Sequence, residues 1–517
     1  MSVKLTASLS AGERRLVLAA CIAAACVASM SVSFNFLLEP MEDTFQPTDA
    51  QMSVLRQAPS IAALLMVFPA GALGTRLGAK RFMVASGLTF SAGCLLVAVA
   101  PVIEVATLGF LVANVGRTGM FIVGLGYMAA VVTSKDGRAA AFAFFYMVLP
   151  VVSIVMPVLA GVLSDGVGWR WVGVTCALLG LAGSGVVARF VPGTPPSGGV
   201  GEMWTLALAG AILALAVYAL DGVRGYGILS SQVLIPLALA GLAAVVLAVL
   251  MRRMTKPSLD LTPLRHGGFS LLLIVLMLFG FANLWFYTTM ALEYIYGLTI
   301  LQAAIAMIPA QVTALAGAAL AGRLIQRVGI PRAGLIFIVA VGLLLWASML
   351  VGPGAPVWLP IVIVSAYAVA AVGAGVPLTN AIMNTAPPRS EGSASAFRGA
   401  ATNLGNALSV ALMTAIVAFT ITTVISGQSS AEGIPVSATE ATQVLQALDH
   451  GASVDTVAAQ YSLPDSDVEG LSSIQQDALY AGFRVQGLVG GAVTLVLAVG
   501  FFVVTRREER LSGSTPG

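Results

Sequence analysis

Two arginines, Arg56 and Arg117, lie within long apolar stretches of the chain, where a charged side chain is costly to place. An ionised group at the centre of a bilayer costs roughly 3 kcal/mol on insertion scales, so such a residue usually faces a cavity or a partner. Arg117 lies deep in its stretch, and we favour a cavity position in which it responds to protonation of a nearby acid. Arg56 lies near the start of its stretch, and we favour a structural ion pair or snorkelling to the membrane surface.

Two carboxylates, Glu39 and Glu293, are the main acidic candidates to act with these arginines. Glu39 directly precedes Pro40, and Glu293 follows a long apolar stretch. A carboxylate in a buried site could exchange a proton during a transport cycle, whereas one at the outer rim of the protein would remain in water. Both interpretations stay open for Glu293, and for Glu39 we favour the rim.

Amide side chains supply uncharged hydrogen-bonding groups in several apolar stretches. Asn380 and Asn384 are four residues apart and therefore share one face of a helix. Trp285 could add an aromatic wall, and a mostly apolar cavity with a few polar groups suits an amphipathic ligand. Alternatively, each amide packs one helix against another. The amides considered are Asn35, Asn114, Asn283, Asn380, Asn384 and Asn403.

The elements that position these residues are predicted to be transmembrane helices. Of the 517 residues, 58% are apolar and only 9% are charged, whereas soluble domains carry roughly 25% charged residues. A bilayer core requires about 20 apolar residues in a helix, and fourteen stretches qualify. They run approximately over 16–38, 52–74, 82–101, 105–133, 139–163, 171–191, 204–220, 233–250, 269–292, 301–324, 335–351, 358–383, 394–425 and 481–504.

The positive charges are distributed unevenly between the predicted loops. With the N-terminus in the cytoplasm, 21 of the 26 Lys and Arg residues fall on the cytoplasmic side. This asymmetry follows the positive-inside rule and, with an even number of helices, places both termini in the cytoplasm. The segment 426–480 contains acidic residues and no Lys or Arg, so we predict an outside loop. A short amphipathic helix over 438–461 is the alternative to a fully solvated loop.

An internal repeat divides the predicted helices into two copies of a six-helix unit. The segments 71–81 and 322–332 are identical at five positions, and 136–142 matches 391–397 in the pattern acidic-Gly-x-Ala-x-Ala-Phe. The two offsets nearly agree, so helices 1–6 and 9–14 are predicted to form two halves, with helices 7 and 8 inserted between them. Parallel six-helix halves around a central cavity imply alternating access, in which the site opens to each side in turn.

These repeated segments resemble the signature loop of major facilitator transporters, and the resemblance covers nearly the whole chain. In that family the loop latches the two halves together on the cytoplasmic side. The segment 156–161 and the Trp-Arg-Trp that follows it resemble the antiporter motif of helix 5, through Pro157 and Gly161. The inserted helix pair and the segment 256–261 resemble the fourteen-span drug:proton antiporter branch. The resemblance implies a cytoplasmic gate that contains Gly71, Arg76, Gly78, Arg81, Asp136, Arg138 and Arg327.

Two positions depart from the pattern of that family. Ser31 occupies the place where helix 1 usually carries an Asp, and Thr75 occupies the place of an acidic residue in the signature loop. The coupling ion is therefore an open question. The predicted fold is an all-α polytopic membrane protein of the major facilitator type. Its predicted domains are an N-terminal six-helix half (1–195), an inserted helix pair with its linker (196–266) and a C-terminal half (267–517) that includes the outside loop 426–480.

The predicted function is export of a small hydrophobic or amphipathic compound, coupled to protons. One alternative keeps the fold but makes Arg56 and Arg117 bind a small organic anion for uniport or uptake. The other is a non-transporting membrane sensor or assembly partner. We expect no enzyme activity, no cofactor, no metal and no nucleic-acid partner, because no nucleophile, nucleotide or metal-ligand pattern occurs. We expect a monomer in a bacterial-type inner membrane.

Overall fold

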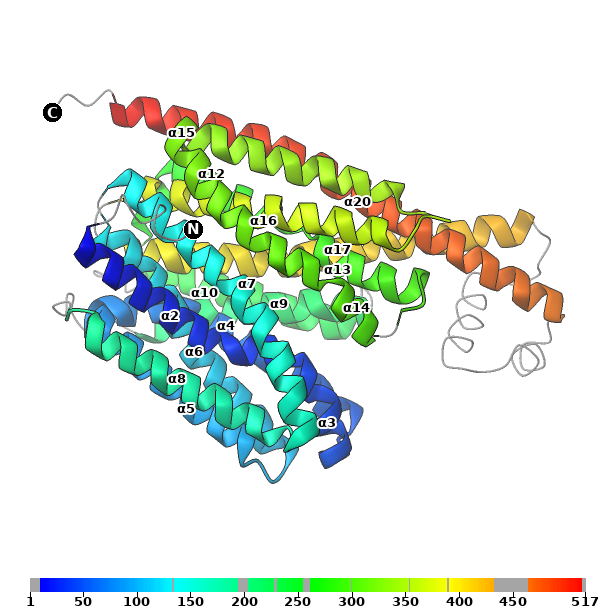
Figure 1. Ribbon diagram of the computed structural model, residues 1–517, viewed down its shortest axis with the longest axis horizontal. Coiled ribbons are helices and arrows are strands. Elements are labelled where there is room, and N and C mark those ends of the chain that lie inside the picture. The colour runs from blue at the N-terminus through cyan, green and yellow to red at the C-terminus, as the bar shows by residue number, and fades with distance from the viewer. Residues whose placement is uncertain are drawn as a thin grey trace.

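The computed structural model is an all-helical bundle (Figure 1). It describes residues 10–132, 134–193, 203–226, 230–253, 261–298, 300–352, 354–387, 390–431 and 464–513. Within these ranges every regular element is a helix and no strand occurs. An all-helical chain satisfies its backbone hydrogen bonds internally, as a bilayer requires.

The N-terminal half forms one group of helices. It comprises α2 (Ala11–Ser33), α3 (Asn35–Phe45), α4 (Asp49–Leu77), α5 (Ala79–Ala98), α6 (Ile103–Val131), α7 (Lys135–Gly166) and α8 (Arg170–Phe190). Helix α5 packs between α6 and α8, α4 packs on α6, and α2 contacts α6, α7 and α8. Gly93 lies against the backbone of α6, where an added Cβ would lie 2.2 Å from the Ala113 nitrogen. This close approach holds α5 and α6 together as a rigid pair.

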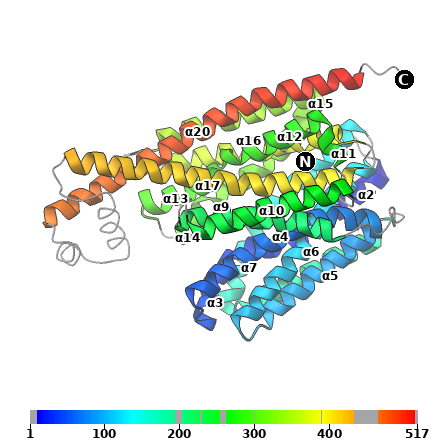
Figure 2. The ribbon, with the colours of Figure 1, turned by 180° about the vertical axis from the view of Figure 1, so that it is seen from behind.

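The inserted pair consists of α9 (Met203–Tyr226) and α10 (Ser231–Arg253). Helix α9 contacts α4 and α17 (Glu391–Ala431), whereas α10 packs mainly on α9 (Figure 2). Large apolar side chains of α10, among them Ile235, Leu242 and Val245, are exposed. An apolar surface of this kind suits contact with lipid.

The C-terminal half contains both very long and interrupted helices. It comprises α11 (Thr262–Arg265), α12 (Gly267–Leu278), η1 (Phe279–Ala282), α13 (Leu284–Met290), η2 (Ala291–Ile295), α14 (Ile300–Ala306), α15 (Ile308–Ala347), η3 (Ser348–Leu350), α16 (Trp358–Thr385), α17 and α20 (Asp465–Gly513). The predicted helix 9 is therefore broken into α12, η1, α13 and η2. The predicted helices 10 and 11 are joined within α15, which has non-helical backbone angles at Gly329.

The predicted all-α membrane class is confirmed, and the chain is a multi-pass membrane protein. Twelve helices among the described residues are long and apolar enough to cross a bilayer. The segment Trp204–Leu220 is apolar but shorter, and the window Ile308–Leu350 contains the break at Gly329. The count of fourteen and the three domain boundaries stay predictions.

The structure differs from the predicted loop 426–480 at both of its ends. Helix α17 continues to Ala431 and α20 begins at Asp465, so these two helices extend beyond the rest of the bundle (Figure 1). At 1.5 Å per residue, the 41 residues of α17 span about 60 Å, well over the roughly 30 Å of a hydrocarbon core. The alternative helix over 438–461 lies outside the described residues.

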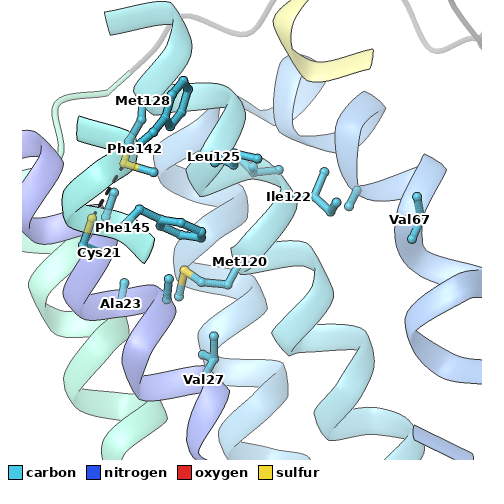
Figure 3. Close-up of a cluster of buried hydrophobic side chains, with 14 of the residues drawn as sticks. Cys21, Ala23, Val27, Val67, Met120, Ile122, Leu125, Met128, Phe142 and Phe145 are labelled. Carbon is cyan, nitrogen blue, oxygen red and sulfur yellow. Dashed lines mark hydrogen bonds between the residues drawn. The ribbon is translucent and has the colours of Figure 1, made fainter. Parts of the chain in front are cut away.

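A buried apolar cluster gives the N-terminal half its rigidity. Phe142 and Phe145 of α7 meet Cys21 of α2 and Met128 of α6 in this cluster (Figure 3). The Cys21 Sγ atom lies 3.8 Å from the Met128 Sδ atom, which brings α2 and α6 into direct contact. Side chains carried by α2, α6 and α7 are therefore held in fixed relative positions by this tight packing.

Candidate functional site

The two halves touch closely at the end of the bundle where Gly78, Arg138 and Gly329 lie, which we call the basic end. Gly71 of α4 faces Gly392 of α17, and a Cβ added to Gly71 would lie 2.8 Å from the Gly392 carbonyl oxygen. A Cβ added to Gly392 would lie 3.1 Å from the Gly71 oxygen. The backbones therefore meet because neither residue has a side chain.

Further contacts join α6 and α4 to α17. The Ser395 hydroxyl donates a hydrogen bond to the Ile122 carbonyl oxygen of α6 over 3.1 Å. The rings of Phe68 on α4 and Phe397 on α17 pack edge to face with centroids 5.4 Å apart. Both contacts join the N-terminal half to α17.

Arg138, a predicted gate residue, meets Asn384, a predicted cavity residue, at this end. The Arg138 Nη1 group donates to the Asn384 Oδ1 atom over 2.9 Å, and its Nε group donates to the Val132 carbonyl oxygen over 2.6 Å. The first bond joins α7 to α16, and the second binds the C-terminal end of α6. Arg138 thus connects three helices across the two halves.

Arg398 is a residue that sequence reasoning missed, because it was counted among the cytoplasmic charges. It is 8% exposed, and its Nε group donates to the Thr379 hydroxyl over 3.1 Å. Its Nη2 group donates to the Tyr146 hydroxyl, which lies 2.9 Å from the Thr379 hydroxyl. The sequence does show a lone arginine inside the predicted helix 394–425. As for Arg117, the cost of a charge within a transmembrane helix indicates that it faces a cavity or a partner.

We call this set of contacts between the halves the basic-end seam. Its members come from α4, α6 and α7 on one side and from α16 and α17 on the other. They are Gly71, Ile122, Arg138 and Tyr146, facing Thr379, Asn384, Gly392, Ser395 and Arg398.

The predicted gate loops adopt matching backbone conformations in the two halves. Gly78 has φ 84° and Gly329 has φ 81°, in the region that favours glycine. The repeated sequence therefore encodes the same sharp turn twice. Of the predicted gate arginines, Arg76 is half-buried, whereas Arg81 and Arg327 are exposed.

A cavity of about 250 Å³ lies between α2, α4 and α6, towards the opposite end of the N-terminal half. Its lining includes Arg56, Ser31 and Asn114. Arg56 is exposed, and its favoured role, a structural ion pair or snorkelling to the membrane surface, stays a prediction. The rings of Phe34 and Phe110 pack edge to face at 4.8 Å and form an aromatic wall. The remaining lining residues are Met30, Pro59 and Ser60.

Arg117 lies three residues beyond Asn114 on α6 and is linked to it. The Arg117 Nε group donates to the Asn114 Oδ1 atom over 2.9 Å, and the Asn114 amide donates to the Phe110 carbonyl oxygen over 2.9 Å. Within the described ranges, no carboxylate forms an ion pair with Arg117 or Arg56. Arg56 therefore lines the cavity itself, whereas Arg117 is linked to the lining through Asn114, and neither has a described counter-charge.

The interruption of the predicted helix 9 leaves backbone groups that other helices satisfy. The Ser409 hydroxyl donates to the Gly280 carbonyl oxygen over 2.7 Å, and the Tyr367 hydroxyl donates to the Ala282 carbonyl oxygen. Asn283 follows the break, and both Asn283 and Trp285 are half-buried. Short 3₁₀ and π segments within a helix often mark functional hinges.

The other predicted site residues take more ordinary positions. Asn380 is buried and donates to the Val376 carbonyl oxygen, and Asn403 donates to the Gly399 carbonyl oxygen of its own helix. Pro157 and Gly161 are half-buried, and a Cβ added to Gly161 would meet nothing within 4 Å. The side chains of Asn35, Glu39, Asp136 and Glu293 lie outside the described part of the structure.

The fold and the repeated halves agree with a known family. The profile of the Major Facilitator Superfamily matches residues 19–410 of this chain. The chain belongs to the major facilitator superfamily. It is therefore a transporter and not an enzyme, and major facilitator transporters bind small-molecule substrates within the membrane.

Two curated relatives within the major facilitator superfamily are resistance proteins of Streptomyces. The chain is 27% identical over 373 residues to a tetracenomycin C resistance and export protein of Streptomyces glaucescens, covering 68% of this chain and 66% of that protein, just under two thirds of its length. It is 24% identical over 364 residues to a methylenomycin A resistance protein of Streptomyces coelicolor, covering 68% of this chain and 74% of that protein.

Solved structures share the major facilitator fold at low sequence identity. The human organic anion transporter MFSD10 superposes with a TM-score of 0.60 at 14% identity, over 93% of this chain and 99% of the other. The proton:xylose symporter XylE superposes with a TM-score of 0.58 at 12% identity, over 93% and 94%. At these identities the likeness shows the fold alone.

Proposed function

We propose that this chain exports a small amphipathic compound by alternating access. The observation that carries the proposal is the basic-end seam, which joins residues of both six-helix halves at one end of the bundle. A seam of hydrogen bonds and glycine contacts can open when the halves rock, since it contains no covalent link. The name of the tetracenomycin C relative supports export as the direction, and the names of both Streptomyces relatives support a natural product or drug as the class of compound.

In this proposal the basic end faces the cytoplasm of a bacterial-type cell and the chain works as a monomer. The positive-inside asymmetry supports this orientation. The seam then closes the cytoplasmic side, and the cavity beside Arg56 lies towards the outside. The conformation corresponds to the step at which an exported compound leaves.

Proton antiport is the coupling mechanism that we propose, with Glu293 as the carboxylate that exchanges protons. Glu293 belongs to η2, the π-helical end of the interrupted helix 9. A hinge at this helix could carry the carboxylate between the two aqueous sides. Moving one charge through the membrane field is worth about 2.3 kcal/mol per 100 mV, enough to drive uphill export.

Energised inside-out membrane vesicles that contain the full chain test the direction of transport. We expect some members of a panel of radiolabelled neutral, anionic and cationic aromatic compounds to accumulate in these vesicles and to leak out when an uncoupler is added. Vesicles from the same host without the chain are the control. Accumulation only in right-side-out vesicles would indicate uptake, and no accumulation of any compound would indicate a non-transporting protein.

Lumenal pH in proteoliposomes tests the coupling ion separately. Adding a transported compound should release protons from wild-type vesicles, and the Glu293→Gln variant should lose this release. Flux of the compound without proton movement in both proteins would contradict antiport while leaving export intact.

A further inference from the structure

The cavity between α2, α4 and α6 has an unusual balance of charge. Arg56 lines it, and Arg117 is hydrogen-bonded to the lining residue Asn114. Among the described side chains no Asp or Glu lines the cavity, and Ser31 contributes only a hydroxyl group. Arg56 is exposed at this cavity, and an anion bound close to its guanidinium would be attracted by its charge.

The side-chain amide of Asn114 has two hydrogen bonds to the protein and one further hydrogen. Its Oδ1 atom accepts from Arg117, and its Nδ2 group donates to the Phe110 carbonyl oxygen. An amide nitrogen carries two hydrogens, so one hydrogen remains after the bond to Phe110. This N–H and the Arg56 guanidinium are both donors, and a carboxylate offers only acceptors.

The rest of the lining is mostly apolar and aromatic, apart from the hydroxyl group of Ser60. Phe34 and Phe110 form an edge-to-face pair, and Met30 and Pro59 add apolar surface. A flat hydrocarbon body would bury its surface against these side chains, with its charged group towards Arg56. The cavity volume of about 250 Å³ suits a small ligand.

We infer that this cavity binds a small aromatic or alicyclic carboxylate as its anion. Arg56 and Asn114 contact the carboxylate, and Arg117 is a positioning residue that holds Asn114 and adds positive potential. The bound anion supplies the counter-charge that the described lining lacks. This inference rests on the proposed export function and names its substrate class.

Equilibrium binding of three probes with one shared ring system tests the charge requirement. The probes are radiolabelled 2-naphthylacetate, 2-naphthylacetamide and 2-(2-naphthyl)ethylammonium, and the protein is the full chain in phosphatidylcholine nanodiscs. We expect saturable binding of the anion, binding of the amide at least about tenfold weaker, and no binding of the ammonium compound. Equal binding of the anion and the amide, or no saturable binding of the anion, would overturn the inference.

Substitutions in the cavity locate the anion. Arg56→Gln and Arg117→Gln should each reduce the preference for the anion over the amide by about tenfold, because a hydrogen bond to a charged group is lost or misaligned. Arg56→Lys should retain part of that preference. Arg189→Gln removes the same charge from an exposed site on α8 and should change neither affinity. An unchanged preference in both cavity variants would contradict the assignment.

Ser31→Asp provides a test that removes no existing contact. A carboxylate at this position would compete with the ligand for Arg56, so anion binding should fall while amide binding stays, and Ser31→Asn should leave both unchanged. An unaltered anion affinity in Ser31→Asp would overturn the inference. Failure of the export function is a separate result, because it would appear as retained anion binding without vesicle flux.

Discussion

The Arg398 guanidinium of α17 donates a hydrogen bond to the Tyr146 hydroxyl of α7, across the boundary between the two six-helix halves. Its second partner, Thr379, belongs to α16. A buried arginine without acceptors carries the full free-energy penalty of its desolvation. The hydrogen bonds of Arg398 to Tyr146 and Thr379 and the closed contact between the two halves therefore stabilise each other. Arg398 therefore acts as a latch within the basic-end seam.

Replacing Arg398 should favour the state that is open at the basic end. We expect Arg398→Gln to raise the rate at which a membrane-impermeant maleimide modifies a reporter cysteine, Ser395→Cys, by about tenfold. The reporter chain carries alanine at its four native cysteines. Tyr146→Phe should have a smaller effect, because Thr379 remains as an acceptor.

The matched control for this latch is Arg332→Gln, which removes an exposed arginine from the same end of the bundle. It should leave the modification rate unchanged. If Arg332→Gln and Arg398→Gln raised the rate equally, overall charge and not the latch would control access to the seam.

The bond between Arg138 and Asn384 should appear as a coupling energy between the halves. Arg138→Ala and Asn384→Ala should each destabilise the protein, and the double variant should be more stable than the sum of the two effects predicts. Hydrogen bonds between membrane helices average about 0.6 kcal/mol in such cycles, and we expect a value of about 0.5–1.5 kcal/mol. The measurement is the free energy of unfolding in mixed micelles titrated with a denaturing detergent.

A second cycle tests whether this coupling is specific. Asn403 bonds within its own helix, so Arg138→Ala and Asn403→Ala should be additive. Additive effects in the first cycle, for Arg138 with Asn384, would show that this contact does not stabilise the closed state.

Gly78→Ala and Gly329→Ala should destabilise the protein by similar amounts. Both glycines have positive φ with extended ψ, 136° and 168°, a region in which a Cβ costs about 1–3 kcal/mol. Gly241→Ala and Gly500→Ala are controls within helices, where an added Cβ meets open space. They should stabilise by up to about 1 kcal/mol, since alanine favours the helix. Equal free energies of unfolding for all four variants would contradict the claim that the turns at Gly78 and Gly329 require glycine.

The repeat made the turns at Gly78 and Gly329 predictable, because a glycine kept at the same place in both copies indicates a shared backbone requirement. Arg117 is half-buried, and its depth in an apolar stretch is visible in the local sequence. The partners of Arg398 were not predictable, because Tyr146 and Thr379 lie far from it in the chain. Arg398 also lies farther inside its helix than predicted, because α17 begins at Glu391, three residues before the predicted helix.

The break in the predicted helix 9 could not be read from the sequence for a related reason. Most residues over 269–292 are apolar, with Asn283 at the break. The carbonyl groups of Gly280 and Ala282 accept hydrogen bonds from Ser409 and Tyr367 of other helices. The local sequence indicates how apolar a helix is. Whether the helix is interrupted depends on side chains of other helices that contact it in the folded bundle.

A reversible cross-link between Gly126 of α6 and Ser395 of α17 tests alternating access most directly. In a chain without native cysteines, Gly126→Cys and Ser395→Cys should form a disulfide on oxidation, because a Cβ added to Gly126 would lie 3.1 Å from the Ser395 Oγ atom. Compound flux in proteoliposomes should then fall to the level of protein-free vesicles and recover fully on reduction, while each single variant keeps its flux under oxidation. If the cross-linked protein transported the compound as fast as the protein with its disulfide reduced, transport by opening of the basic-end seam would be contradicted.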